Sequence, residues 1–168
     1  MIYRLTILLL IFGCKDENPE LENFRGITEI DVDGNLISED SDDWYGNEYR
    51  NTHCITDTPS EDTESEETSM QSESLPETYK FIPAFPNPFD TLVSVHYGLP
   101  TNSQVNLRII DKNGNKIIQI LNENQNEGFH CVSWDGKDEN GEALDSALYR
   151  ILFYAGDFFS HGDILYSP

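Results

Sequence analysis

Phe85-Pro86-Asn87-Pro88-Phe89 separates two stretches of very different composition. Each proline fixes φ and removes a backbone donor, and the residue before each proline is restricted to extended geometry. The two flanking aromatic rings favour burial. The stretch therefore predicts a stiff elbow at the entrance to a folded domain. Its prolines would prevent edge pairing of the entering chain, and one or both rings would pack the end of the core.

After the elbow, short apolar alternations are separated by turn signals at regular intervals. Asn113-Gly114 is a strong hairpin signal between two of them. The expected strands lie near 79–82, 92–97, 105–110, 116–121, 128–134, 147–154 and 158–165. Regular short strands with few helical periods predict an all-β fold, an immunoglobulin-like antiparallel β-sandwich of about seven strands at 79–168.

The chain carries a net charge of −21, most of which lies before the sandwich. Residues 15–78 contain 20 Asp and Glu against 3 Lys and Arg, whereas residues 79–168 contain 11 against 6. A field of this sign repels phosphates, so no nucleic-acid partner is expected. Residues 57–77 are rich in Ser, Thr and Glu and poor in apolar side chains, which is typical of a disordered linker. We interpret 14–78 as a largely disordered acidic tether.

Within this tether, alternation at 27–32 and the turn signal Asp33-Gly34-Asn35 indicate a short hairpin near 27–37. An isolated hairpin is marginal in water. It is therefore expected either to dock on the main domain, through Trp44 and Tyr45, or to fluctuate. Oxygen-bearing side chains at every second position from Asp31 also resemble a calcium loop, but the glycine is misplaced for an EF-hand loop and no glutamate lies twelve residues from the start, so an acidic turn is the preferred interpretation.

The N-terminus has the features of a processing signal. A short basic start and an apolar run at 5–12 end in Gly13-Cys14. The run is shorter than the roughly 20 residues of a membrane span. Residues 1–13 resemble a bacterial lipoprotein signal peptide, which implies lipidation of Cys14 and a membrane anchor. Lys15-Asp16-Glu17 resembles a surface-export signal, so the outer membrane is expected, on either its periplasmic face or the cell surface.

Two cysteines remain once Cys14 is assigned to the lipid. Outside the cytoplasm, Cys54 and Cys131 can oxidise and staple the tether to the domain. Two separate thiols, free or buried, are the alternative. His53 next to Cys54 has no second half of a zinc site, so a metal role is not expected there.

Several residues in the folded part occur in the order of a known family. They are Phe85-Pro86-Asn87-Pro88-Phe89, a strand ending in Tyr97-Gly98-Leu99-Pro100, the stretch 105–114, Gly128-Phe129-His130, Trp134-Asp135-Gly136 through Asn140-Gly141, and Ala147-Leu148-Tyr149-Arg150. This order resembles the FlgD-type immunoglobulin-like domain and is similar to the C-terminal sorting domains of type IX secretion cargo. The resemblance implies a non-catalytic structural, sorting or assembly module.

Candidate binding residues are few. Asp135, Asp138 and Asn140 gather oxygens in one loop, which fits either a weak calcium site or side chains that cap their own turn. Trp134 before this loop is expected to anchor the core. The histidines lie on different strands, and no nucleophile or metalloprotease motif is present, so the chain is not expected to be an enzyme.

Two functions remain open at this point. The first is a lipid-anchored envelope protein that presents the sandwich as a structural or interaction domain. The second is a sorting or docking domain that secretion machinery recognises. The expected partners are the membrane, through the lipid, and an envelope or secretion-machinery protein.

Overall fold

The computed structural model describes residues 20–21, 24, 26–45, 54 and 75–168. The predicted signal peptide, Cys14 and most of the Ser/Thr/Glu-rich stretch lie outside these residues. Over the described part of the chain, no helix is long and apolar enough to cross a membrane.

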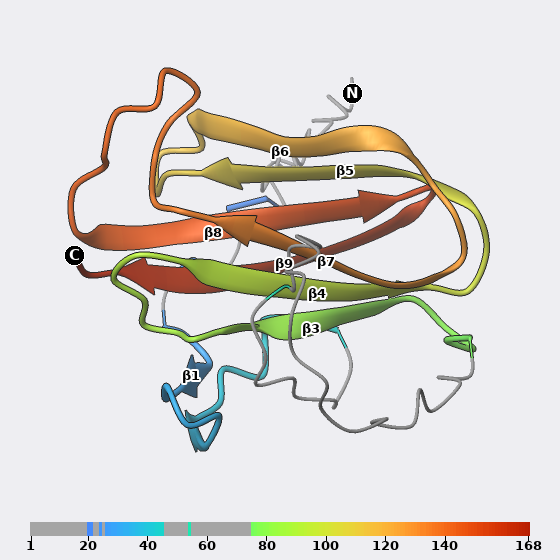
Figure 1. The fold of residues 1–168 in the computed structure, drawn as a ribbon, viewed down its shortest axis with the longest axis horizontal. Helices are drawn as coiled ribbons and strands as arrows, with labels where there is room; N and C mark the ends of the chain where they lie inside the picture. Colours follow the sequence, from blue (N-terminus) through green and yellow to red (C-terminus); the bar gives the residue numbers. More distant parts are fainter. Residues whose placement is uncertain (1–19, 22–23, 25, 46–53, 55–74) are drawn as a thin grey trace, which may run out of the picture.

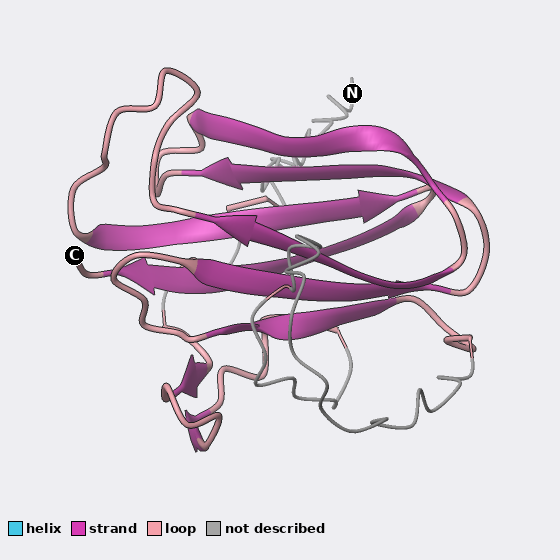
Figure 2. Ribbon diagram, in the orientation of Figure 1, coloured by secondary structure: helices cyan, strands magenta, loops and turns pink. Residues whose placement is uncertain are grey.

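Seven strands form the sandwich and two more form a small hairpin outside it (Figures 1 and 2). The hairpin consists of β1 (Glu29–Ile30) and β2 (Leu36–Ser38). The sandwich strands are β3 (Lys80–Phe85), β4 (Val93–Leu99), β5 (Ser103–Ile110), β6 (Lys116–Gln125), β7 (Gly128–Trp134), β8 (Ala147–Ala155) and β9 (Phe158–Tyr166). The prediction of an all-β sandwich of about seven strands is confirmed, and each expected strand is found.

The sandwich has two antiparallel sheets. One contains three strands in the order β3-β4-β7, and the other contains four in the order β6-β5-β8-β9. The edge strands β3 and β9 contact each other on one side of the sandwich. β6 and β7, which only residues 126–127 separate in sequence, form the other two sheet edges. Residues 26–45 attach to the sandwich on the side where β3 and β9 meet.

Side chains that alternate along the strands build the core, because successive residues of a strand point to opposite faces of its sheet. On β5, Val105, Leu107 and Ile109 point inward and are fully buried. On β4, Val95 and Tyr97 do the same. Aromatic rings from both sheets meet in the centre, where Phe81, Phe153 and Tyr97 pack with ring centroids 4.8 to 5.1 Å apart.

The elbow packs into this core. Phe85 and Phe89 are 3% and 2% exposed, and the side chain of Asn87 is fully buried. The Phe85–Pro86 and Asn87–Pro88 peptide bonds are both cis. Phe89 forms an isolated bridge to Tyr166, so the elbow lies against the end of β9.

Residues 26–45, which we name the strap, lie on the sandwich. Ile30 is buried and exchanges two backbone hydrogen bonds with Asn87, at 2.8 and 3.1 Å. Tyr45 exchanges two more with Phe81 on β3, at 2.8 and 2.7 Å. Of the two alternatives that the sequence left for the hairpin, the structure has it docked, and Trp44 and Tyr45 supply contacts as expected. This part of the predicted tether is therefore joined to the sandwich, because Ile30 and Trp44 are buried against it.

Candidate functional site

The outer edge of β9 is the most elaborately built feature of the described chain. An edge strand exposes a row of unpaired N–H and C=O groups, which form a template for pairing with another strand. Six such groups, on His161, Asp163, Leu165 and Ser167, accept or donate a hydrogen bond here. No regular strand supplies the partners. They come instead from the strap and the elbow.

The elbow completes the C-terminal half of this edge. The Asn87 side-chain amide donates to the carbonyl of Asp163 at 2.9 Å and accepts from the amide of Leu165 at 2.9 Å. Asn87 thus takes the place of a peptide group of a neighbouring strand. Phe89 follows with its backbone, donating to Leu165 at 3.0 Å and accepting from Ser167 at 2.8 Å.

The strap completes the other half. The Asp43 carboxylate accepts from the amide of Asp163 at 2.9 Å, and the amide of Trp44 donates to the carbonyl of His161 at 2.7 Å. The Trp44 ring lies directly on Gly162, since a Cβ built there would be 2.4 Å from the ring. The same ring contacts Phe81 of β3 with centroids 4.9 Å apart. Trp44 therefore spans the gap between the two sheets.

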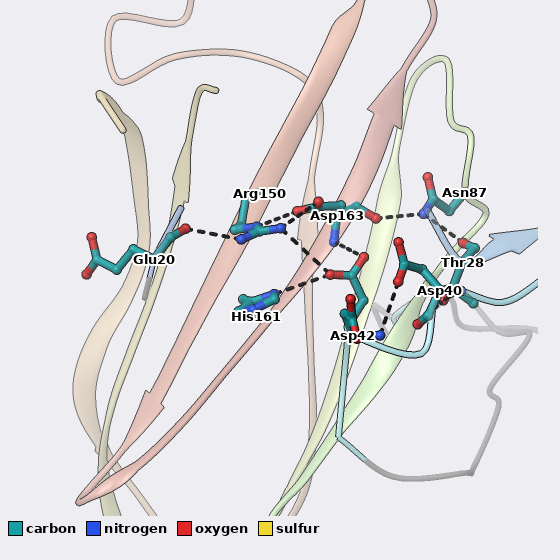
Figure 3. A network of polar contacts seen from close by, with 9 residues as sticks. Glu20, Thr28, Asp40, Asp42, Asn87, Arg150, His161 and Asp163 are labelled. Carbon is teal, nitrogen blue, oxygen red and sulfur yellow. Dashed lines mark hydrogen bonds and ion pairs between the residues drawn. The ribbon is translucent and has the colours of Figure 1, made fainter. Parts of the chain in front are cut away.

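A second contact ties the elbow to the strap. The Asn87 side chain also donates to the carbonyl of Thr28 at 2.9 Å (Figure 3). The Thr28 hydroxyl accepts from the amide of Asp40 at 3.2 Å, so the two ends of the hairpin are joined beside Asn87. One buried amide side chain consequently links β9, the elbow and the strap.

A buried ion cluster lies next to this edge. Arg150 on β8 and Asp163 on β9 are both fully buried and form a two-point pair, with nitrogen–oxygen distances of 2.5 and 2.7 Å. Asp43 from the strap approaches Arg150 at 4.0 Å and His161 at 3.2 Å. Burial raises the pKa of Asp163 to about 6, and the nearby Arg150 opposes this shift. Because buried pairs lose hydration, such a cluster contributes mainly to a defined arrangement of its partners.

Residues that precede the strap contact the outer face of the four-stranded sheet. The Glu20 carboxylate pairs with Arg108 and accepts from the Tyr154 hydroxyl. The backbone carbonyl of Glu20 accepts from Arg150 at 3.3 Å, and the Phe24 ring lies 4.6 Å from the Arg150 guanidinium carbon. Burial raises the pKa of Tyr154 to about 12, and the neighbouring Glu20 acts in the same direction. The part of the chain that contacts the four-stranded sheet therefore begins at least as early as Glu20.

The structure joins Cys54 to Cys131 of β7 in a disulfide with a Cα–Cα distance of 5.5 Å. The Cys54 amide also donates to the Ser94 hydroxyl of β4 at 3.1 Å. The sequence left a disulfide and two separate thiols as alternatives, and the structure has the disulfide. The bond fastens the three-stranded sheet to a residue that precedes β3 by 26 positions in sequence.

The loop proposed as a calcium site is organised as a turn. Asp138 accepts from the amides of Asn140 and Glu142 at 2.8 and 2.9 Å, and the Asn140 side chain donates to its second oxygen. The amide of Glu142, first, and the Asn140 side chain lower the pKa of Asp138. Asp135 pairs with Lys137 instead. Within the described residues, no group of three His, Cys, Asp or Glu is placed to hold a metal ion.

The same turn occurs three times in the part of the chain that the structure describes. Asp31, Asp111 and Asp138 each begin a five-residue turn in which one carboxylate oxygen accepts from the second and the fourth following amides. In each turn the fourth residue is a glycine with φ between 82° and 84°, a region that favours glycine. The calcium-like spacing at Asp31 is therefore explained by local capping, which requires the same oxygen atoms.

The remaining landmark residues lie around Trp134. Its indole nitrogen donates to the carbonyl of Lys137 at 2.8 Å, and its ring packs against Phe89, Tyr149 and Tyr166. Gly136 lies under Tyr166, where a Cβ would be 2.5 Å from the ring. Gly141 has φ +82° and open space beside it, so it serves the turn. These residues close the end of the sandwich and form no chemical centre.

Sequence reasoning did not find the roles of Arg150, Asp163 and Asp43. A signal was present for Arg150, which is the only charged residue in the otherwise apolar run 147–153 and therefore required a buried partner. Nothing in the sequence identified Asp163 or Asp43 as that partner, because 13 residues separate Asp163 from Arg150 and 120 separate it from Asp43. Asn87 was recognised as a landmark, but its contacts to three segments were not foreseen.

The two sheets, their connections and the aromatic packing at Trp134 define an immunoglobulin-like sandwich. Residues 89–156 match the family model of the FlgD Ig-like domain. The match covers β4 to β8 and confirms the resemblance seen in the sequence over that stretch. This family consists of structural, non-catalytic domains. No curated protein matches the chain.

Proposed function

We propose that this protein is a non-catalytic, lipid-anchored component of the bacterial cell envelope that presents an Ig-like domain for structural or interaction purposes. The observation that carries the domain's role is the match of residues 89–156 to the FlgD Ig-like domain, on a sandwich of the corresponding fold. The proposed anchor rests on the apolar run that ends in Gly13-Cys14. A lipid chain on Cys14 would hold the domain at the outer membrane, facing the periplasm or the cell exterior.

The arrangement of the described chain supports a fixed presentation of the domain. If Cys14 carries the lipid, only five residues lie between it and Glu20, which already contacts β5 and β8. Since an extended residue spans at most about 3.6 Å, the sandwich would lie within roughly 25 Å of the membrane surface. The acidic tether predicted from the sequence would then separate the membrane from the sandwich only over the residues before Glu20, because Glu20 already contacts the four-stranded sheet.

A fractionation experiment tests the anchor. The wild-type chain and Cys14→Ser are expressed in a diderm bacterium, and membrane and soluble fractions are blotted with and without surface proteolysis of intact cells. The proposal predicts that the wild-type protein is in the outer-membrane fraction and that Cys14→Ser leaves it. Cys131→Ser serves as the matched control and should stay membrane-bound. Tight membrane association of Cys14→Ser would contradict the proposal.

The same experiment addresses the alternative of a type IX sorting domain. That function predicts wild-type protein in the medium. The C-terminal strand that such machinery would recognise is β9, whose Tyr166 is buried, and Ser167 directly after it donates to the elbow. The anchored interaction domain is therefore the function that we prefer.

A further inference from the structure

The β1–β2 hairpin exposes an unusual share of the apolar surface. Val32, Leu36 and Ile37 are 78%, 43% and 60% exposed. The described residues hold only three other large exposed apolar side chains, Tyr45, Leu75 and Leu92, and these are apart from the hairpin in sequence. Single exposed apolar residues are ordinary, but a group of three on one small element is typical of an interaction surface.

The hairpin is held firmly on one side and open on the other. Its β1 strand is fixed by the buried Ile30, which pairs with Asn87 of the elbow. Its β2 strand pairs only with β1 among the described strands, and all three of its residues are exposed. Figure 1 shows β1 and its hairpin outside the two sheets, below β3 and β4. The molecule therefore presents a short apolar edge strand on a rigid support.

This open edge contrasts with the edge of β9. On β9 six backbone groups are completed by Asn87, Asp43, Trp44 and Phe89. On β2 two of the usual protections against strand addition are missing, since residues 36–38 contain no proline and no lysine, and the strand's length of 3 residues is the protection that remains. An exposed apolar edge of this kind is the template on which an extended peptide adds as a further strand.

Charge indicates which peptide fits. The strap contains seven acidic residues and no Lys or Arg, and four of the acidic residues, Glu29, Asp31, Asp33 and Glu39, lie on or next to the hairpin strands. A second copy of this chain would bring these like charges together, which is unfavourable across paired strands. An anionic lipid surface would be repelled for the same reason. A positively charged, extended segment matches both the apolar edge and its acidic surroundings.

We propose that the β2 edge, with Val32, Leu36 and Ile37, is the docking site for a basic, extended segment of another protein, which adds to β2 as a third strand. Leu36 and Ile37 point to opposite faces of the hairpin. Apolar side chains on one face of the segment would cover Ile37, the more exposed of the two, and Lys or Arg side chains on its other face would lie near the surrounding carboxylates. The proposal names a surface for the interaction role proposed above, but it does not depend on the lipid anchor.

A peptide titration tests the docking site. The full chain, purified in a non-ionic detergent, is titrated against a fluorescent ten-residue peptide of alternating Lys and Val, and binding is followed by anisotropy at low salt. The hairpin variant carries Val32→Thr, Leu36→Thr and Ile37→Thr, which keep the charge and the strand propensity. The matched control carries Leu75→Thr and Leu92→Thr. An alternating Glu and Val peptide is the probe for charge selectivity.

The proposal predicts that the Lys/Val peptide binds to the wild type and to the control equally, and at least about tenfold more weakly to the hairpin variant. The Glu/Val peptide should not bind. Equal binding to all three proteins would overturn the proposal, because attraction between net charges would then explain it. Superimposable unfolding curves of the three proteins establish that the substitutions leave the fold intact.

Sedimentation velocity of the same samples distinguishes the other occupants. The proposal predicts a monomer with the same bound detergent in the wild type and the hairpin variant. A wild-type dimer that the hairpin variant lacks would show that a second copy covers the edge. Additional detergent on the wild type alone would show that the edge is a lipid-facing surface. Either result would overturn the proposal. The interpretation of these binding and sedimentation results does not depend on whether Cys14 anchors the protein.

Discussion

Asn87 makes more connections between segments than any other residue of the elbow. Its side chain reaches Thr28, Asp163 and Leu165, and its backbone pairs with Ile30. A buried amide that is fully satisfied can fix one arrangement of several segments, whereas its loss leaves buried donors and acceptors without partners. The chemistry of one side chain thus decides whether the strap and β9 stay together.

Replacement of Asn87 by alanine should lower the free energy of unfolding by about 2–4 kcal/mol, because three buried backbone groups lose their partner. Chemical denaturation of the full chain measures this loss. Asn140→Ala is the control, since the Asn140 side chain bonds only within an exposed turn. A loss no greater than that of the control would show that Asn87 is not the link described here.

Asp163 should make the stability depend on pH. Its pKa in the folded state is raised from 3.8 to about 6, so between these values the folded state holds a proton that the unfolded state has released. Stability from this group is therefore present at low pH and is lost as pH rises from 3.8 to 6, by up to about 1.4 kcal/mol per pH unit.

The test compares unfolding free energies of the wild type and Asp163→Asn across that window. The wild type should lose stability relative to the variant as pH rises. Parallel pH profiles for wild type and Asp163→Asn would mean that Asp163 titrates as in the unfolded chain.

Among the elements, β9 and its completed edge show where sequence reasoning succeeds and where it stops. Alternation along 92–97 and 105–110 and the Asn113-Gly114 turn are local signals, and they predicted the corresponding strands because side chains alternate along a strand. The partners of β9 come from residues 43–44 and 87–89, which are far away in sequence. Such pairings depend on the packing of the whole fold, so local patterns contain no information about them.

The candidate calcium loop illustrates the same limit. Alternating oxygens at Asp31 and Asp138 are compatible with a cation and with a capped turn. The sequence does not distinguish the two, because both use carboxylate oxygens at every second position. The positions of the amide donors show the capped turn, and those positions come from the backbone.

The disulfide should stabilise the three-stranded sheet and its connection to residue 54. Replacing Cys54 and Cys131 together by serine should lower the free energy of unfolding by about 2–5 kcal/mol, since the bond closes a sequence separation of 77 residues. Reduction should bring the wild type to the stability of the double variant and leave the variant unchanged. An effect of the reductant on the variant, or none on the wild type, would contradict the bond.

In the whole molecule, the folded unit includes the strap as well as the seven sandwich strands. The sequence placed the beginning of the domain at residue 79, because residues 14–78 are acidic and poor in apolar side chains. Trp44 and Ile30 nevertheless are buried, and they close the side of the sandwich between β3 and β9. These two buried residues, with the hydrogen bonds of Thr28, Asp43 and Tyr45, attach a segment whose average composition is that of a linker.

Native-state amide hydrogen exchange of the full chain tests this result most directly. The strap amides of Ile30, Trp44 and Tyr45, together with the amides of Phe81 and Asp163 that donate to the strap, should be protected to an extent comparable with the amides of the central strand β5. Exchange of these five amides at rates near those of an unfolded chain, while the β5 amides remain protected, would contradict the account.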